Sequence, residues 1–168
     1  HEALAELHAR LGDDRAAGRH LRLARTCAIG GQFRGDGVEI PGETHELMRV
    51  AALYDAGRFG EALAAFEGLR ARAEEEGNRP LALRLQNNVG LCLYRLGRLE
   101  EAEAEYRALL DEDPAYIKGY TNLAKVRAAR GETEDAKALY GEALRLDPDN
   151  PRIRADLEKL DREAGGGG

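Results

Sequence analysis

Aromatic and β-branched residues are scarce in this sequence: aromatics make up 5% of the 168 residues, and tryptophan is absent. This scarcity argues against a sheet, because both kinds of residue are enriched in strands. Alanine, leucine, glutamate and arginine dominate instead, and all four favour helix. The composition therefore predicts an all-α fold, in a chain long enough for one domain with a hydrophobic core.

Cysteines are few and apolar runs are short. Cys27 and Cys92 lie far apart, without the CxxC spacing of a redox or zinc motif, and both are expected as reduced thiols. No apolar stretch approaches the roughly 20 residues that cross a bilayer, and no segment resembles a signal peptide. We therefore expect a cytoplasmic location, while a leader or a further domain before His1 is an alternative that these residues leave open.

Positive charge is in deficit, with a formal net charge of -6 and a sequence pI of about 5.4. A protein of this charge repels phosphate backbones and anionic membrane surfaces. Neither nucleic acid nor a membrane is therefore expected as a partner.

Residues that could support catalysis do not form a recognisable motif. The four histidines show no HExxH or paired metal-ligand spacing. A group of carboxylates alternates with alanine in the first turns of a predicted helix: Glu100, Glu101, Glu103 and Glu105. Such a placement suits solvent and the helix dipole, and we predict a solvated helix face there. We expect no enzymatic activity, no cofactor and no metal.

A repeat of 34 residues is the main positive signal. GRLEEAEAEYRALLDEDP at 97–114 aligns without a gap on GETEDAKALYGEALRLDP at 131–148. The identical pairs include Gly97 and Gly131, Ala102 and Ala136, Tyr106 and Tyr140, Leu110 and Leu144, and Pro114 and Pro148. A period of this length indicates stacked helix pairs, because one pair cannot bury its apolar face alone.

The unit resembles the tetratricopeptide repeat, whose pattern is a large apolar residue, Leu-Gly, Tyr, a turn Gly, Ala, an aromatic, Ala and Pro. Residues 117–150 match this pattern through Ala136, Tyr140 and Pro148, while Arg127 stands where an aromatic is usual. The resemblance implies antiparallel helix pairs stacked as a right-handed α-solenoid.

The expected organisation is a single domain over residues 1–164. Its segments are a partial repeat 1–29, a glycine-rich loop 30–42, repeats 43–82, 83–116 and 117–150, a capping helix 151–164, and a flexible glycine tail 165–168. Within each full repeat, a glycine free to take positive φ is expected to end the first helix: Gly57, Gly97 and Gly131. The first repeat has no cap before it, so its edge is expected to allow pairing with a second copy.

The resemblance also implies a binding surface, because in this family the first helix of each pair lines a concave groove. The expected lining residues are Leu47, Tyr54, Arg84, Asn87, Asn88, Leu91, Tyr94, Arg95, Lys118, Thr121, Asn122, Lys125, Arg152 and Lys159. Every charged residue in this set is basic, although the chain as a whole is acidic. Charge complementarity therefore predicts an acidic peptide or protein segment as the partner.

The predicted function is a non-enzymatic scaffold that binds a peptide or protein segment. The alternative is a regulatory or sensor domain of a larger protein, such as a transcriptional regulator. The carboxylate clamp that grips chaperone tails in this family is not expected. Asn88 and Lys118 match its positions, but Leu47, Ala51 and Asn122 occupy the others.

Overall fold

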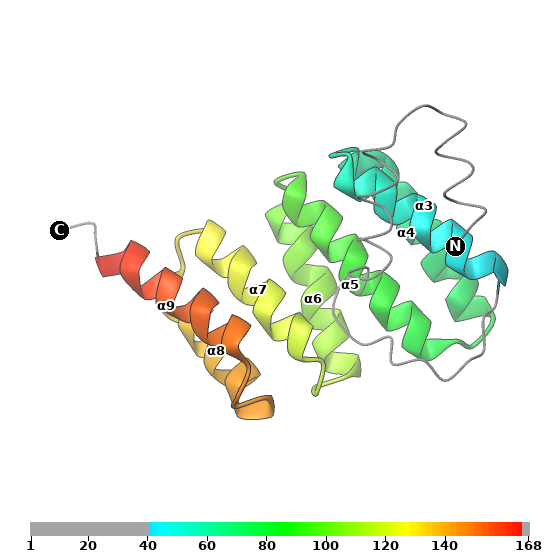
Figure 1. Cartoon of the computed structure of the whole chain (residues 1–168). Helices are drawn as coiled ribbons and strands as arrows, with labels where there is room; N and C mark the ends of the chain where they lie inside the picture. Colours follow the sequence, from blue (N-terminus) through cyan, green and yellow to red (C-terminus); the bar gives the residue numbers. More distant parts are fainter. Residues whose placement is uncertain (1–40, 166–168) are drawn as a thin grey trace. The chain divides into compact units, whose positions relative to one another are not determined.

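The computed structural model describes residues 41–165 of the chain, with side chains from Glu46 to Ala164. Within this range there are helices joined by short turns and no strand (Figure 1). The helices are α3 (Pro41–Asp55), α4 (Phe59–Glu75), α5 (Arg79–Arg95), α6 (Leu99–Glu112), α7 (Ile117–Ala129), α8 (Thr133–Leu146) and α9 (Pro151–Gly165). The all-α prediction is confirmed. None of the described helices is both long enough and apolar enough to cross a membrane.

The chain divides into two compact units, with the boundary after Gly57. In the described range the first unit contributes α3, and the second contains α4 to α9. Helix α3 begins at Pro41, so the last two residues of the predicted loop 30–42 belong to this helix. The predictions for the partial repeat 1–29, for Cys27 and for most of that loop lie outside the described residues.

Within the second unit, each helix packs against the next one along the chain. The turns inside the pairs contain Gly97 and Gly131, whose φ angles are 76° and 79°. In the first of these turns the N–H of Arg98 donates to the carbonyl of Leu93 at 2.9 Å, a bond that closes a helix over a left-handed residue. Only glycine takes this conformation without strain, so the predicted turn glycines are confirmed.

Two layers of helices result from this alternation. Helices α5, α7 and α9 form the inner layer, and α4, α6 and α8 form the outer layer behind it (Figure 1). The layers approach closely because small residues lie between them: Ala62, Ala102 and Ala136 are 0% exposed. Gly90 of α5 faces the buried ring of Tyr106 in α6, and a Cβ atom at position 90 would lie 2.7 Å from that ring.

An ion network joins α6 to α7 and corrects the prediction for Glu103. The sequence predicts a solvated carboxylate, but Glu103 is only 8% exposed. Its two carboxylate oxygens accept hydrogen bonds from Arg127 and Arg130, each at 2.6 Å. Arg127 also donates to Glu132 at 2.5 Å. Arg127 thus replaces the usual aromatic by pairing with a carboxylate of the preceding repeat.

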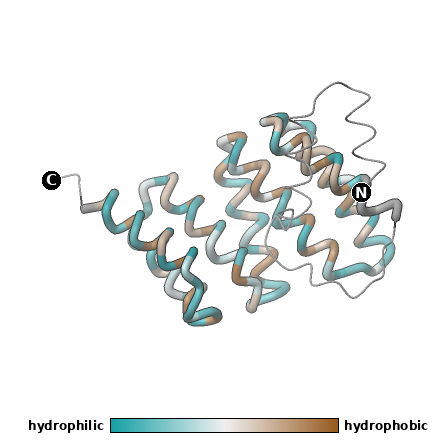
Figure 2. The backbone as a smooth tube through the Cα atoms, in the orientation of Figure 1, coloured by the Kyte–Doolittle hydropathy of each residue, from teal (hydrophilic) through white to brown (hydrophobic). Residues whose placement is uncertain are grey.

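Helix α9 ends the stack with one apolar face and one charged face. Ile153 and Leu160 are buried in a cluster with Tyr140 and other residues of α7 and α8. The remaining surface of α9 is predominantly hydrophilic (Figure 2). The side chain of Asn150 caps the helix by accepting from the N–H groups of Arg152 and Ile153 at 3.1 and 3.3 Å.

Candidate functional site

Two side-chain contacts fix how the inner helices lie against one another. The amide of Asn122 in α7 donates to Oδ1 of Asn87 in α5 at 2.9 Å. Further along, Nζ of Lys125 in α7 lies 3.4 Å from Oδ2 of Asp156 in α9. These contacts place α5, α7 and α9 side by side. Residues one or two turns from a contact, on the same face of their helix, therefore lie near their counterparts on the next inner helix.

The asparagine pair lies beneath the predicted binding surface. Asn87 and Asn122 are 2% and 9% exposed, and their hydrogen bond satisfies two polar groups in the interior. Repeat register assigns both to the lining set, but neighbouring inner helices approach closely enough to cover them. Their role in this structure is to join α5 to α7.

Other predicted lining residues keep part of their surface accessible. Asn88, Leu91 and Tyr94 in α5 are half-buried, as is Thr121 in α7, whose hydroxyl donates to the carbonyl of Lys118 at 3.2 Å. A partly accessible apolar or polar side chain on a rigid helix can contact a ligand without ordering a loop first. These residues form the middle of the inner face.

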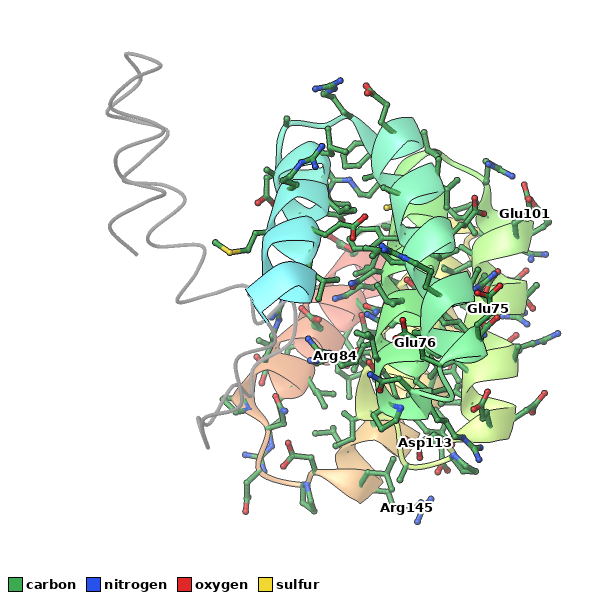
Figure 3. The ribbon with its side chains drawn as sticks, turned by 90° about the vertical axis from the view of Figure 1, so that its right-hand side faces the viewer. Glu75, Glu76, Arg84, Glu101, Asp113 and Arg145 are labelled. Carbon is green, nitrogen blue, oxygen red and sulfur yellow. The ribbon has the colours of Figure 1, made fainter. Side chains whose placement is uncertain are left out.

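Three basic residues lie together at one end of this face, and we call Arg84, Lys118 and Arg152 the basic cluster. Arg84 and Lys118 stand one turn before the Asn87–Asn122 hydrogen bond on their helices, and therefore lie next to each other. Arg152 stands one turn before Asp156, the residue that joins α9 to α7. Figure 3 shows Arg84 on the side of the molecule opposite to Glu101.

The electrostatics of Lys118 agree with this geometry. The pKa of Lys118 is held below its ordinary value of 10.5, first because the ammonium group is partly buried and then because Arg84 and Arg152 repel it. Arg84 also acts on the phenol of Tyr116, the residue before α7, although burial raises the pKa of that phenol above its ordinary value. Positive charge is therefore concentrated where the three helices meet.

The other predicted cations are not part of this cluster. Lys125 pairs with Asp156, and Lys159 lies 3.7 Å from Glu163 on the exposed side of α9. Arg95 ends α5, and its guanidinium lies 4.8 Å from the ring centroid of Phe59. Sequence reasoning missed Asp156, although the register that selects Arg152 and Lys159 also places Asp156 beside them.

Leu47 and Tyr54 belong to α3 in the first unit, where both are half-buried. Their place relative to the basic cluster stays a prediction. Cys92 is fully buried, and burial, with a smaller contribution from Glu67, raises the pKa of its thiol to about 12. A thiol of this kind is a packing residue. Within residues 41–165, no group of three or more His, Cys, Asp or Glu is arranged to hold a metal ion.

The fold and this inner face define a helical-repeat protein of the solenoid class. Sequence profiles of the tetratricopeptide repeat family match residues 47–117 and 118–160. These matches cover more than half of the chain, and the chain therefore belongs to the tetratricopeptide repeat family.

Known proteins of this family resemble the chain over most of its described length. It is 30% identical over 113 residues to the Hsp70-Hsp90 organizing protein of Triticum aestivum. The aligned stretch covers 67% of this chain and 18% of that relative. The chain thus spans less than a fifth of the length of this relative.

Two solved structures share the fold. The second tetratricopeptide domain of human RPAP3, in complex with the HSP70 peptide SGPTIEEVD, is 21% identical over 69% of this chain and 92% of that domain, with a TM-score of 0.54. The Yersinia enterocolitica type III secretion chaperone SycD, in complex with a peptide of the translocator YopD, is 16% identical. That match covers 77% of this chain and 99% of SycD, with a TM-score of 0.60.

Proposed function

We propose that this chain is a non-enzymatic interaction scaffold whose inner face binds a peptide or protein segment that carries acidic residues. The observation that carries the proposal is the basic cluster, which gathers three cations from three helices of a protein whose net charge is -6. Against an acidic background, such a cluster steers and orients an anionic partner.

The inner face suggests how the segment would lie. Its acidic part would meet Arg84, Lys118 and Arg152, and an apolar side chain would contact Leu91 and Tyr94 further along α5. Ordering an extended segment costs free energy, so we expect a dissociation constant on the order of micromolar. The peptide held by the human RPAP3 domain also contains adjacent glutamates, which supports an acidic ligand.

The relatives' chaperone peptides are not assigned to this chain. Lys118 stands at a clamp position, but Asn122 is buried and bonded to Asn87. Asn122 therefore offers its amide to a neighbouring helix instead of to a ligand. The proposed partner is defined by its acidic residues and not by a chaperone C-terminus.

A charge-reversal experiment tests this function. Arg84→Glu with Lys118→Glu should abolish measurable binding of a fluorescent, Glu-rich nonapeptide containing one Leu and one Tyr. The matched control is Arg145→Glu with Arg154→Glu, which changes the net charge equally on exposed residues outside the cluster. Equal loss of binding in both double variants would show that only total charge matters and would contradict the proposal. Circular dichroism checks that both variants keep their helicity.

A further inference from the structure

Helix α9 is joined to each layer of the stack by an ion pair. To the inner helix α7, Oδ2 of Asp156 lies 3.4 Å from Nζ of Lys125. To the outer helix α8, Oδ1 of Asp161 lies 2.8 Å from Nζ of Lys137. A charge-assisted hydrogen bond between an ammonium group and a carboxylate is typically about 2.7 to 2.9 Å long. The outer pair therefore has the geometry of a close contact, whereas the inner pair is looser.

The looser pair lies on the inner face. Lys118, Thr121 and Lys125 follow one another along one face of α7, at the spacing that brings helical residues together. Helices α5 and α7 contain no aspartate or glutamate, so α9 supplies the carboxylate that meets Lys125. The side chains of Lys125 and Asp156 are 34% and 30% exposed, and both charges are therefore accessible to a ligand.

Tyr94 of α5 approaches the same part of the inner face. Tyr140 of α8 is buried, and burial raises the pKa of its phenol above the ordinary value of 10.0. Asp156 and Tyr94 raise that pKa further, so both lie near this one phenol. Tyr94 is also a contact position for an apolar side chain in the proposed function. An apolar contact and an ion pair thus lie close together here.

We propose that Lys125 is a second carboxylate-binding position of the inner face, which Asp156 occupies in the free protein and an acidic residue of the partner takes over. The exchange replaces one carboxylate at the ammonium group by another, and the displaced Asp156 can be solvated because it is already partly exposed. Partly exposed ion pairs are weak, so a partner can compete with this one. Helix α9 thereby lowers the affinity for acidic segments that do not reach Lys125.

The distance between the two anchors predicts the spacing of the partner's acidic residues. Lys118 and Lys125 lie two turns apart on α7, which is about 10.5 Å along the helix axis. An extended segment covers this distance with about three residues, at about 3.3 Å each. This inference rests on the proposed function, because the first acidic residue is the one at the basic cluster. We expect the second acidic residue three positions away from it.

The test uses two blocked fluorescent nonapeptides of equal charge, each with one Leu and one Tyr on a neutral background. The wide peptide carries glutamate at positions 4 and 7, and the narrow peptide carries glutamate at positions 4 and 5. Fluorescence anisotropy with the full chain should show about 3-fold tighter binding of the wide peptide. Asp156→Asn should strengthen the wide peptide by about a further 3-fold and the narrow peptide by less than about 1.5-fold, because only the wide peptide presents a carboxylate to Lys125.

Asp161→Asn is the matched control, because it removes one carboxylate and one lysine ion pair from the same helix, but on the side of the outer layer. It should change the affinity for either peptide by less than about 1.5-fold. Lys125→Gln should remove the preference for the wide peptide. Thermal unfolding of the three variants checks that α9 stays docked, and the comparison of the two peptides within one variant is independent of any change in stability.

The outcomes separate this inference from the proposed function. If Asp156→Asn strengthens both peptides equally, Asp156 acts only by general repulsion, and the displacement is refuted while the acidic-segment function stands. If Asp156→Asn and Asp161→Asn act alike, or if Lys125→Gln keeps the preference for the wide peptide, the assignment to the inner pair is overturned. If neither peptide binds to the wild type or to Asp156→Asn, and the Glu-rich peptide also fails, both proposals fail.

Discussion

The inner and outer helices of this protein differ in charge although they share one core. Helices α5 and α7 contain arginine and lysine but no aspartate or glutamate. Helix α6 has the opposite composition, with Arg107 as its single basic residue among Glu100, Glu101, Glu103, Glu105, Asp111 and Glu112. The outer helices thus obey the helix-dipole rule at their starts, and the inner helices do not. This difference fits the proposal that the inner layer binds a partner, while the outer layer follows the pattern that stabilises helices.

The contact between the layers gives the largest expected effect. Gly90→Ala would place a methyl group 2.7 Å from the ring of Tyr106, which is fully buried and cannot move aside. We expect the free energy of unfolding to fall by about 3 kcal/mol, measured by urea denaturation. Gly141→Ala is the control, because that helical position faces open space, and it should gain about 0.5 to 1 kcal/mol. Equal effects at both glycines would contradict the close packing of α5 on α6.

The ion network between α6 and α7 gives the next largest effect. Glu103→Ala leaves Arg127 and Arg130 with only part of their partners, and should lower the free energy of unfolding by about 2 kcal/mol. The exposed neighbour variant Glu100→Ala should leave stability nearly unchanged. Adding Arg127→Tyr, which restores an aromatic at the repeat position, should recover part of the loss of Glu103→Ala. If Arg127→Tyr recovers none of the stability lost in Glu103→Ala, the ion network does more than replace the packing of the usual aromatic residue.

Salt should act on the two layers in different ways. Because the basic cluster is partly solvent-exposed, raising the ionic strength from about 0.05 M to 0.5 M should weaken binding of the Glu-rich peptide by about 10-fold. Stability should change much less, since the buried contacts between layers are screened weakly. Fluorescence anisotropy at several salt concentrations measures the first effect, and thermal unfolding measures the second. Binding that is independent of salt would contradict a charge-driven site.

A substitution at Lys118 should separate stability from function with the smallest structural change. Lys118→Met removes the charge but keeps a flexible apolar stem, so the variant should be slightly more stable at pH 7 and bind acidic peptide more weakly. The pKa of Lys118 in the folded chain is lowered, first by burial. As the pH rises towards 10.5, the folded chain therefore loses this proton before the unfolded chain does, and the stability of the wild type increases. Wild-type stability should therefore approach that of Lys118→Met above this pH. A variant that is less stable at pH 7 would contradict the predicted cost of this charge.

Much of the fold was predictable because the repeat constrains several levels at once. Several features of the sequence specify the same helix pairs: the offset of 34 between Tyr106 and Tyr140, the turn glycines, and the small residues Ala102 and Ala136. Their burial and the positive φ angles at Gly97 and Gly131 confirm them. Periodicity fixes which residues face a neighbouring helix, and this information is local to each repeat.

The details of the site were less predictable, because they depend on contacts between repeats. Register alone could not show that Asn87 and Asn122 bond to each other, or that Glu103 is buried by Arg127. It selected Lys125 as a groove cation, but Asp156 partly neutralises that charge. The result is a single cluster at one end of the inner face in place of an even row of cations.

The most direct test of the central claim is to map the binding face by nuclear magnetic resonance. Titration of the isotope-labelled chain with the Glu-rich nonapeptide should shift backbone amides around Arg84, Lys118 and Arg152 most strongly. Amides at the exposed surface of α6 should remain unchanged. Shifts concentrated on α6 or α8, with none at the starts of α7 and α9, would contradict the account.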